Sequence, residues 1–424
     1  MNKKKNCITV FEHERLKIDG KSGFEESHLT TLQKYHSEQS GDFYSLIYKG
    51  VKFNSHVGVI KVGGLSIEVL PKADKHSADK DNWRKLLIDM MRSVGLFTIH
   101  APTSAALSLK NNFILDLYFD LFLTETEYLF HKGLIKKYRK TEGNKYTLKG
   151  SLLFGKHIQQ NLVHQERFYL RHSTYDTAHV LHQILYKTLF LLKRINTNVA
   201  LKSRIGALLL HFPEMSDITV SETTFNRIVY NRKTESYREV MKTARLLLLN
   251  YHPDLSRGHN DVLALMFDMN ALWERFVYVS LRKKSDKSFK VTAQNTEHFW
   301  RPTGGRSRKV RPDIVLSDGN TNIVLDTKWK NIGNGKPSME DLRQMYVYAD
   351  LFAAEKVALV YPGAGELIAG DYYDKKSQKF ERGCALMPIG LPDGKSVDVK
   401  VWQGVIREQV EGFCGFLSPR AELK

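Results

Sequence analysis

The twenty residues from Arg311 to Lys330, RPDIVLSDGNTNIVLDTKWK, constrain this chain more than any other stretch. They predict two short strands, Arg311 to Leu316 and Asn322 to Trp329, because both are rich in aliphatic and β-branched residues. Between them stands the turn sequence Ser317-Asp318-Gly319-Asn320, in which Gly and Asn accept positive φ. We therefore expect a β-hairpin.

This hairpin carries two acids and a lysine. Side chains two apart on a strand share a face, so Asp326 and Lys328 point the same way, and the turn can bring Asp313 beside Asp326. Paired carboxylates repel unless a cation lies between them, and Mg²⁺ prefers such hard oxygen ligands. A lysine can neutralise developing negative charge. The chemistry of these three side chains suits a site for phosphodiester hydrolysis. Their spacing is common in proteins, however, and by itself favours a surface hairpin with solvated side chains.

Helices are expected on both sides of the hairpin. Ser338 to Asp341 is a capping-box-like start for a helix that runs to about Ala354 and places Gln344 and Tyr348 on one face. Upstream, the segment from Val262 to Leu281 predicts a long helix that carries Glu274. Short strands are predicted at Ser288–Thr292 and Lys356–Tyr361.

The order helix, strand, strand, strand, helix, strand resembles the core of the PD-(D/E)xK nuclease superfamily. The resemblance implies that Asp313 and Asp326 are the two acids and Lys328 the lysine of that motif. It implies an extra acid at Glu274 on the first helix. Gln344 and Tyr348 match the QxxxY pattern of some branches, with Tyr348 in a supporting place.

A cationic stretch lies directly before Asp313. It has no acid between residues 301 and 311, and a flexible approach of this kind would counter phosphate repulsion beside a carboxylate site. We therefore predict that its side chains, together with Lys330, bind the DNA backbone. The predicted contacts are Arg301, Arg306, Arg308, Lys309, Arg311 and Lys330.

Composition points to a globular protein with a polyanionic partner. The 424 residues suffice for two or three domains, and the formal charge of +18 favours nucleic acid over a membrane surface. The three cysteines are far apart and form no CxxC, which fits a reducing cytosol and argues against a disulfide or zinc framework. The longest apolar runs fall far short of a membrane span. The chain has no GxxxxGK[ST] motif, so we expect it to bind no nucleotide itself.

We predict an α/β protein, α+β overall, in three parts. Residues 1–105 form a β-rich region in which Val57–Val62 and Leu65–Leu70 pair across Gly63-Gly64, used for docking or purely structural. Residues 106–250 form a helical middle region. Its basic runs at 136–140 and 145–149 are either solvated helix ends or a nucleic-acid surface. Residues 251–424 form an endonuclease domain, with a further strand at Val397–Val401.

Several segments resemble the McrC family. The most specific are Leu325–Lys330, Asp341–Ala349 and Asn270–Val277. In the earlier chain, Val62–Lys72 ends in Pro-Lys as family members do, and Lys149–Phe154 resembles the family's RGxLxF stretch with Lys for Arg.

The resemblance implies a Mg²⁺-dependent DNA endonuclease subunit of a modification-dependent (5-methylcytosine) restriction system in phage defence. On general grounds we expect a cytoplasmic protein. Its partners would be an McrB-type AAA+ GTPase hexamer, docked by the N-terminal region, and modified double-stranded DNA. The metal ligands would be Asp313, Asp326, Glu274 and the Thr327 carbonyl. Two alternatives remain: a non-catalytic adaptor that activates the ring and holds DNA, and a stand-alone nuclease.

Overall fold

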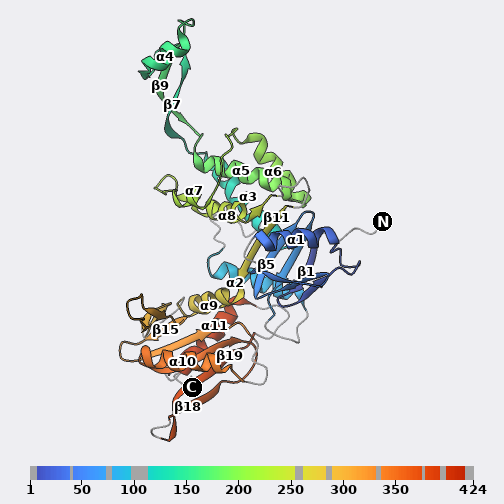
Figure 1. The fold of residues 1–424 in the computed structure, drawn as a ribbon, viewed down its shortest axis with the longest axis vertical. Helices are drawn as coiled ribbons and strands as arrows, with labels where there is room; N and C mark the ends of the chain where they lie inside the picture. The colour runs from blue at the N-terminus through green and yellow to red at the C-terminus, as the bar shows by residue number, and fades with distance from the viewer. Residues whose placement is uncertain are drawn as a thin grey trace, which may run out of the picture. The chain divides into compact units, whose positions relative to one another are not determined.

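The computed structural model describes residues 7–38, 42–72, 79–96, 113–253, 261–282, 289–330, 336–374, 378–391 and 398–415. The chain divides into two compact units, one of Met1–Thr98 with Met266–Lys424 and one of Ile99–Leu265. The mixture of helices and strands confirms the α/β class (Figure 1). The domain boundary predicted at residue 105 lies outside the described residues, and the three-part division stays a prediction.

The N-terminal part of the first unit is a small β-rich assembly. Strand β1 runs parallel to β6, and β6 forms an antiparallel hairpin with β5. That hairpin confirms the Gly-Gly prediction, and Gly63 takes the positive φ of 54° that such a turn requires. Strands β2, β4 and β3 form a second sheet. The elements are β1 (Cys7–Phe11), β2 (Arg15–Lys17), α1 (Glu26–Glu38), β3 (Tyr44–Ile47), β4 (Gly50–Phe53), β5 (His56–Val62), β6 (Leu65–Leu70) and α2 (Lys80–Ser93).

The C-terminal part of this unit is built on a six-stranded mixed sheet in the order β12-β15-β16-β17-β19-β18. Strands β16, β17 and β19 are parallel, and the other pairs are antiparallel. The elements are α9 (Met269–Arg282), β12 (Lys290–Ala293), β13 (Glu297–Trp300), β14 (Arg308–Val310), β15 (Ile314–Ser317), β16 (Asn322–Thr327), α10 (Met339–Leu351), β17 (Ala354–Pro362), β18 (Ile368–Asp374), β19 (Lys379–Ile389) and α11 (Val399–Cys414).

Helices pack on this sheet through apolar side chains. Met345 and Tyr348 of α10 join one buried cluster with Val324 of β16 and Leu359 of β17. A second group of large rings comes from α9 and α11, where the Trp273 and Trp402 ring centroids lie 5.1 Å apart. The α10 cluster fixes the orientation of β16, because Val324 and every second residue after it must face α10.

Two predictions about these elements were wrong. The segment Val262–Leu281 is not one helix: β11 (Val262–Asp268) precedes α9, since a short, fully apolar run suits a buried strand as well as a helix. The strand predicted at Val397–Val401 is wrong from Asp398 on, where α11 begins, and Val397 lies outside the described residues. Asp398 caps that helix by accepting the backbone N–H of Lys400 at 2.8 Å.

The second unit combines helices with a three-stranded sheet in the order β7-β9-β8. The basic run that begins at residue 136 lies mostly in β7 and is not a helix end, which corrects that prediction. Figure 1 shows α4 beside β9. The elements are α3 (Ile114–Lys132), β7 (Lys137–Lys145), β8 (Ser151–Leu152), α4 (Phe154–Asn161), β9 (Phe168–Asp176), α5 (Val180–Ile195), α6 (Val199–His211), α7 (Glu222–Asn226), η2 (Glu235–Tyr237), α8 (Arg238–Leu249) and β10 (Tyr251–His252), which pairs with β11.

Helix α3 is largely apolar, and most of its side chains are buried. Within the described ranges, no helix has both the length and the apolar character needed to cross a bilayer.

Candidate active site

The predicted trio meets where the hairpin of β15 and β16 opens. Ile314 pairs with Leu325, so the same register continued by one residue sets Asp313 opposite Asp326. Asp326 is two residues beyond Val324 and therefore faces α10, and so does the side chain of Lys328 at the strand's end. The sequence placed these three residues together, and the structure brings them together.

Asp313 is held by the neighbouring strand. Its Oδ2 accepts the backbone N–H of Thr327 at 2.7 Å and the Thr327 hydroxyl at 2.8 Å. Its own carbonyl oxygen accepts the backbone N–H of Gln294 at 3.0 Å. These contacts fix one carboxylate oxygen of Asp313 against β16.

Asp326 and Lys328 form an ion pair at 2.7 Å, and α10 completes the group. Lys328 Nζ donates to Gln344 Oε1 at 3.3 Å, and Gln344 Nε2 donates to the Tyr348 hydroxyl at 2.7 Å. That hydroxyl donates to the carbonyl oxygen of Arg311 at 3.1 Å. Gln344 and Tyr348, which the helical spacing placed on one face, thus connect the lysine to the chain just before Asp313.

Burial makes the electrostatics of this group unusual. Asp326 is 1% exposed. Burial, and next the charge of Asp313, raise the pKa of Asp326 to about 6, although Lys328 opposes the shift. Burial lowers the pKa of Lys328, but the charge and hydrogen bond of Asp326 together with the charges of Asp313 and Asp341 outweigh burial, and the net pKa is raised. Lys328 is therefore an ammonium that stabilises negative charge.

Glu274 lies near the trio but turns to another partner. Its Oε1 accepts from Gln294 Nε2 at 2.9 Å, and burial followed by the charge of Asp313 raises its pKa. Among the residues that the structure describes, no three His, Cys, Asp or Glu side chains converge as a metal-binding group. The predicted set of three acids is thus not assembled, and Asp313 and Asp326 are the two that adjoin each other.

The cationic stretch, residues 301–311, supplies the loop and the second strand of a hairpin formed by β13 and β14, so it is not wholly the flexible approach that we predicted. Its predicted DNA-binding side chains Arg301, Arg306, Arg308, Lys309 and Arg311 are all exposed. Lys330 instead forms an ion pair with Asp341, with its side chain still 46% exposed.

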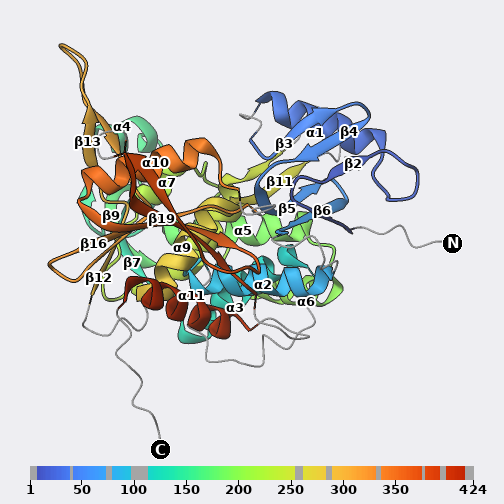
Figure 2. The same ribbon diagram turned by 90° about the horizontal axis from the view of Figure 1, so that it is seen from below.

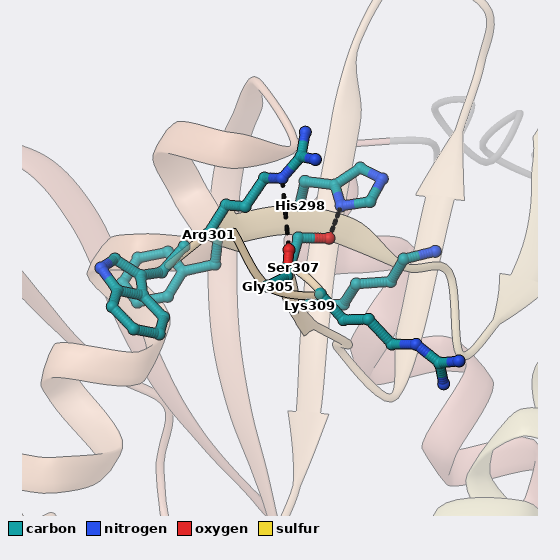
Figure 3. Close-up of a pocket in the computed structure, with 8 residues that line it drawn as sticks. His298, Arg301, Gly305, Ser307 and Lys309 are labelled. Atoms are coloured by element: carbon teal, nitrogen blue, oxygen red, sulfur yellow. Dashed lines mark hydrogen bonds between the residues drawn. The ribbon is translucent and has the colours of Figure 1, made fainter. Parts of the chain in front are cut away.

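A cavity of about 650 Å³ lies on this hairpin (Figure 3). Ser307 hydrogen-bonds His298 Nδ1 at 2.5 Å across it, and Arg301 Nε donates to the Gly305 carbonyl at 3.4 Å. Sequence reasoning missed Phe299 and Trp300, whose signal was two aromatics within an otherwise polar strand. The lining residues are His298, Phe299, Trp300, Arg301, Gly305, Arg306, Ser307 and Lys309.

The chain is similar to known proteins in sequence and in fold. A family model described as "McrBC 5-methylcytosine restriction system component" matches residues 51–362. Comparison with curated proteins gave no match. One solved structure, a half-complex from a tetradecameric assembly of Thermococcus gammatolerans McrB AAA+ hexamers with bound McrC, has a chain with TM-score 0.73 and 18% identity, covering 96% of this chain and 100% of its own length. A second, the Thermococcus gammatolerans McrBC complex, gives TM-score 0.51 and 19% identity over 65% of this chain and 87% of its own.

Proposed function

We propose, from the premise that this chain belongs to the McrBC 5-methylcytosine restriction system component family, that it is the subunit that hydrolyses DNA phosphodiester bonds. The observation that supports this most is the meeting of Asp313, Asp326 and Lys328 at one end of the β15–β16 hairpin. The matched family range includes all three residues. The resemblance to the McrC family predicted from the sequence is confirmed.

The residues present fit Mg²⁺. Asp326 is almost fully buried beside a second carboxylate, an arrangement that a cation would relieve. Mg²⁺ retains several waters and needs only one or two carboxylates, so two acids suffice. Asp313, Asp326 and the Thr327 carbonyl would hold the ion. Glu274, on α9, would be an additional acid near it. A bound Mg²⁺ would supply Lewis-acid stabilisation of the phosphate and a more acidic water.

The remaining residues act on charge and position. Lys328 offsets negative charge that develops on the phosphate oxygens, since its ammonium is retained in the folded protein. Gln344 orients that ammonium through its Oε1, and Tyr348 holds Gln344 and the Arg311 carbonyl. The exposed arginines of the β13–β14 hairpin would bind DNA phosphates.

We further propose that the chain works with an McrB-type AAA+ GTPase hexamer on modified double-stranded DNA. The support is the shared fold with a chain of an assembly that contains McrB hexamers with bound McrC, and the family's description as a 5-methylcytosine system. The N-terminal region would dock on that ring, in the cytoplasm.

The test uses the purified full chain, the AAA+ partner, GTP, Mg²⁺ and a methylated plasmid, with double-strand breaks as readout. The wild type should cut, and Asp326→Asn should lower the rate by about 10²-fold or more while partner binding persists. The control Glu366→Gln, an exposed acid of the same unit, should cut as the wild type does.

Three other results would change the proposal. Equal cutting by Asp326→Asn would refute the assigned site. Stimulated GTP hydrolysis without any cleavage would indicate the non-catalytic adaptor. Cleavage that persists when partner and GTP are omitted would indicate the stand-alone nuclease.

A further inference from the structure

The β13–β14 hairpin is anchored to the proposed active site at both of its ends. At the first end, Gln294 donates its backbone N–H to the Asp313 carbonyl and its side chain to Glu274. At the second end, the Arg311 carbonyl accepts from Tyr348. A ligand on this hairpin would therefore be held at a fixed offset from the acids. Figure 2 shows the hairpin extending away from the six-stranded sheet.

This hairpin exposes two large aromatic side chains side by side in the sequence. Phe299 is 55% exposed and Trp300 57% exposed, and both line the cavity. The contrast with the other tryptophans is sharp, because Trp83, Trp273, Trp329 and Trp402 are each at most 6% exposed. Contiguous exposed apolar surface with a polar rim often marks a binding site.

Cations surround these rings. Arg301, Arg306 and Lys309 line the same cavity, and all three are exposed. Aromatic rings interleaved with a cationic groove match the chemistry of unpaired nucleotides, whose bases stack on the rings while the phosphates meet the cations. A base pair inside an intact duplex offers no free face, so only the cations would contact it.

We infer that the β13–β14 hairpin binds unpaired DNA nucleotides, with a base stacked on Trp300 or Phe299 and the flanking phosphates held by Arg301, Arg306 and Lys309. This inference rests on the proposed nuclease function, because it names the form of DNA delivered to that site. Beside the acids, the hairpin would hold a DNA segment that has been separated from its complementary strand or flipped out of the duplex.

The first experiment uses tryptophan emission of the full chain in EDTA, without cleavage. The exposed Trp300 should be quenched when a mixed-sequence single strand of about 12 nucleotides is added. The matched duplex should quench it far less. In Trp300→Leu the quenching should vanish, while the four buried tryptophans still report a folded protein.

The second experiment measures affinity by fluorescence anisotropy of the same labelled oligonucleotides. Trp300→Leu and Phe299→Leu should each weaken single-strand binding about 5- to 100-fold and change duplex binding less than about 2-fold. Arg306→Ala should weaken both. Tyr48→Leu, which removes a ring 82% exposed in the β3–β4 turn, serves as the matched control and should change neither.

The outcomes separate this inference from the function it rests on. Single-strand binding that is unaffected by both Trp300→Leu and Phe299→Leu in a chain that cuts DNA overturns the inference alone. So does an equal loss for single strand and duplex. Trp300-dependent binding of single strands by a chain that never cuts DNA overturns the nuclease proposal and leaves this inference standing.

Discussion

Two neighbouring hairpins of the same unit carry charged side chains in opposite surroundings. The β15–β16 hairpin places Asp326 in a site where it is 1% exposed, whereas the β13–β14 hairpin holds its arginines and two aromatic rings in water. Burial raises the pKa of Asp326 to about 6, and Asp326 forms an ion pair with Lys328. The difference teaches that burial separates the two proposed roles: reaction chemistry for the acids of the β15–β16 hairpin and DNA binding for the exposed β13–β14 hairpin.

The largest effect, on the rate of DNA cleavage, is expected when one lysine from each hairpin is replaced and the two variants are compared. Lys328→Ala should lower the DNA cleavage rate about 10²- to 10³-fold, because it removes a half-buried ammonium that pairs with Asp326. Lys309→Ala removes an exposed charge and should act on DNA affinity, by less than about 10-fold. Single-turnover cleavage at saturating DNA measures the first effect and a binding titration the second. Similar losses of cleavage rate in the two variants would contradict the proposal that the two hairpins have different roles.

The next effect concerns pH and the buried acid. The pKa of Asp326 is raised in the folded state, so its contribution to stability is fully present below about pH 4 and is lost as the pH rises through about 6. Asp326→Asn lacks this dependence. The free energy of unfolding of the variant minus that of the wild type should therefore increase between pH 4 and 7, by up to about 3 kcal/mol.

Denaturant unfolding of both proteins in EDTA at several pH values measures this change. Glu366→Gln, the exposed control, should show no such trend. A difference that stays constant with pH would mean that Asp326 is not desolvated in the folded protein.

A smaller effect on the cleavage rate is expected from Tyr348, which contacts the proposed site through Gln344. Tyr348→Phe removes the hydroxyl that accepts from Gln344 and donates to the Arg311 carbonyl. It should cost about 1 kcal/mol of stability and about 10-fold in cleavage rate, with DNA affinity unchanged, because Lys328 loses its orientation and not its charge. Thermal unfolding and single-turnover kinetics check it. A changed affinity with an unchanged rate would place Tyr348 with the exposed hairpin instead.

The smallest effect tests the exposed hairpin by salt. Arg306→Ala should reduce the slope of log affinity against log salt concentration by about 0.7 for a single strand. The same slope for Lys328→Ala should stay near that of the wild type, since Lys328 already pairs with Asp326. Anisotropy titrations at several salt concentrations give both slopes. An unchanged slope in Arg306→Ala would show that this side chain contacts no phosphate.

Local pattern predicted much of the framework. Turn residues and alternation were enough for the hairpins β5–β6 and β15–β16, because these signals act between residues close in sequence. The capping sequence at Ser338 was likewise enough for α10, whose N-cap Ser338 accepts from the backbone of Asp341. Prediction failed for Val262–Asp268, a strand whose continuous apolar run has no period of its own.

The sequence by itself determined that Asp313, Asp326 and Lys328 lie together, since strand spacing and one turn bring them to the same end of the hairpin. Only the tertiary structure decided their surroundings: that α10 presents Gln344 to Lys328, that Glu274 turns to Gln294, and that Trp300 is exposed while four other tryptophans are buried. The physical reason is that burial and long-range hydrogen bonds depend on segments distant in sequence, which no local pattern encodes.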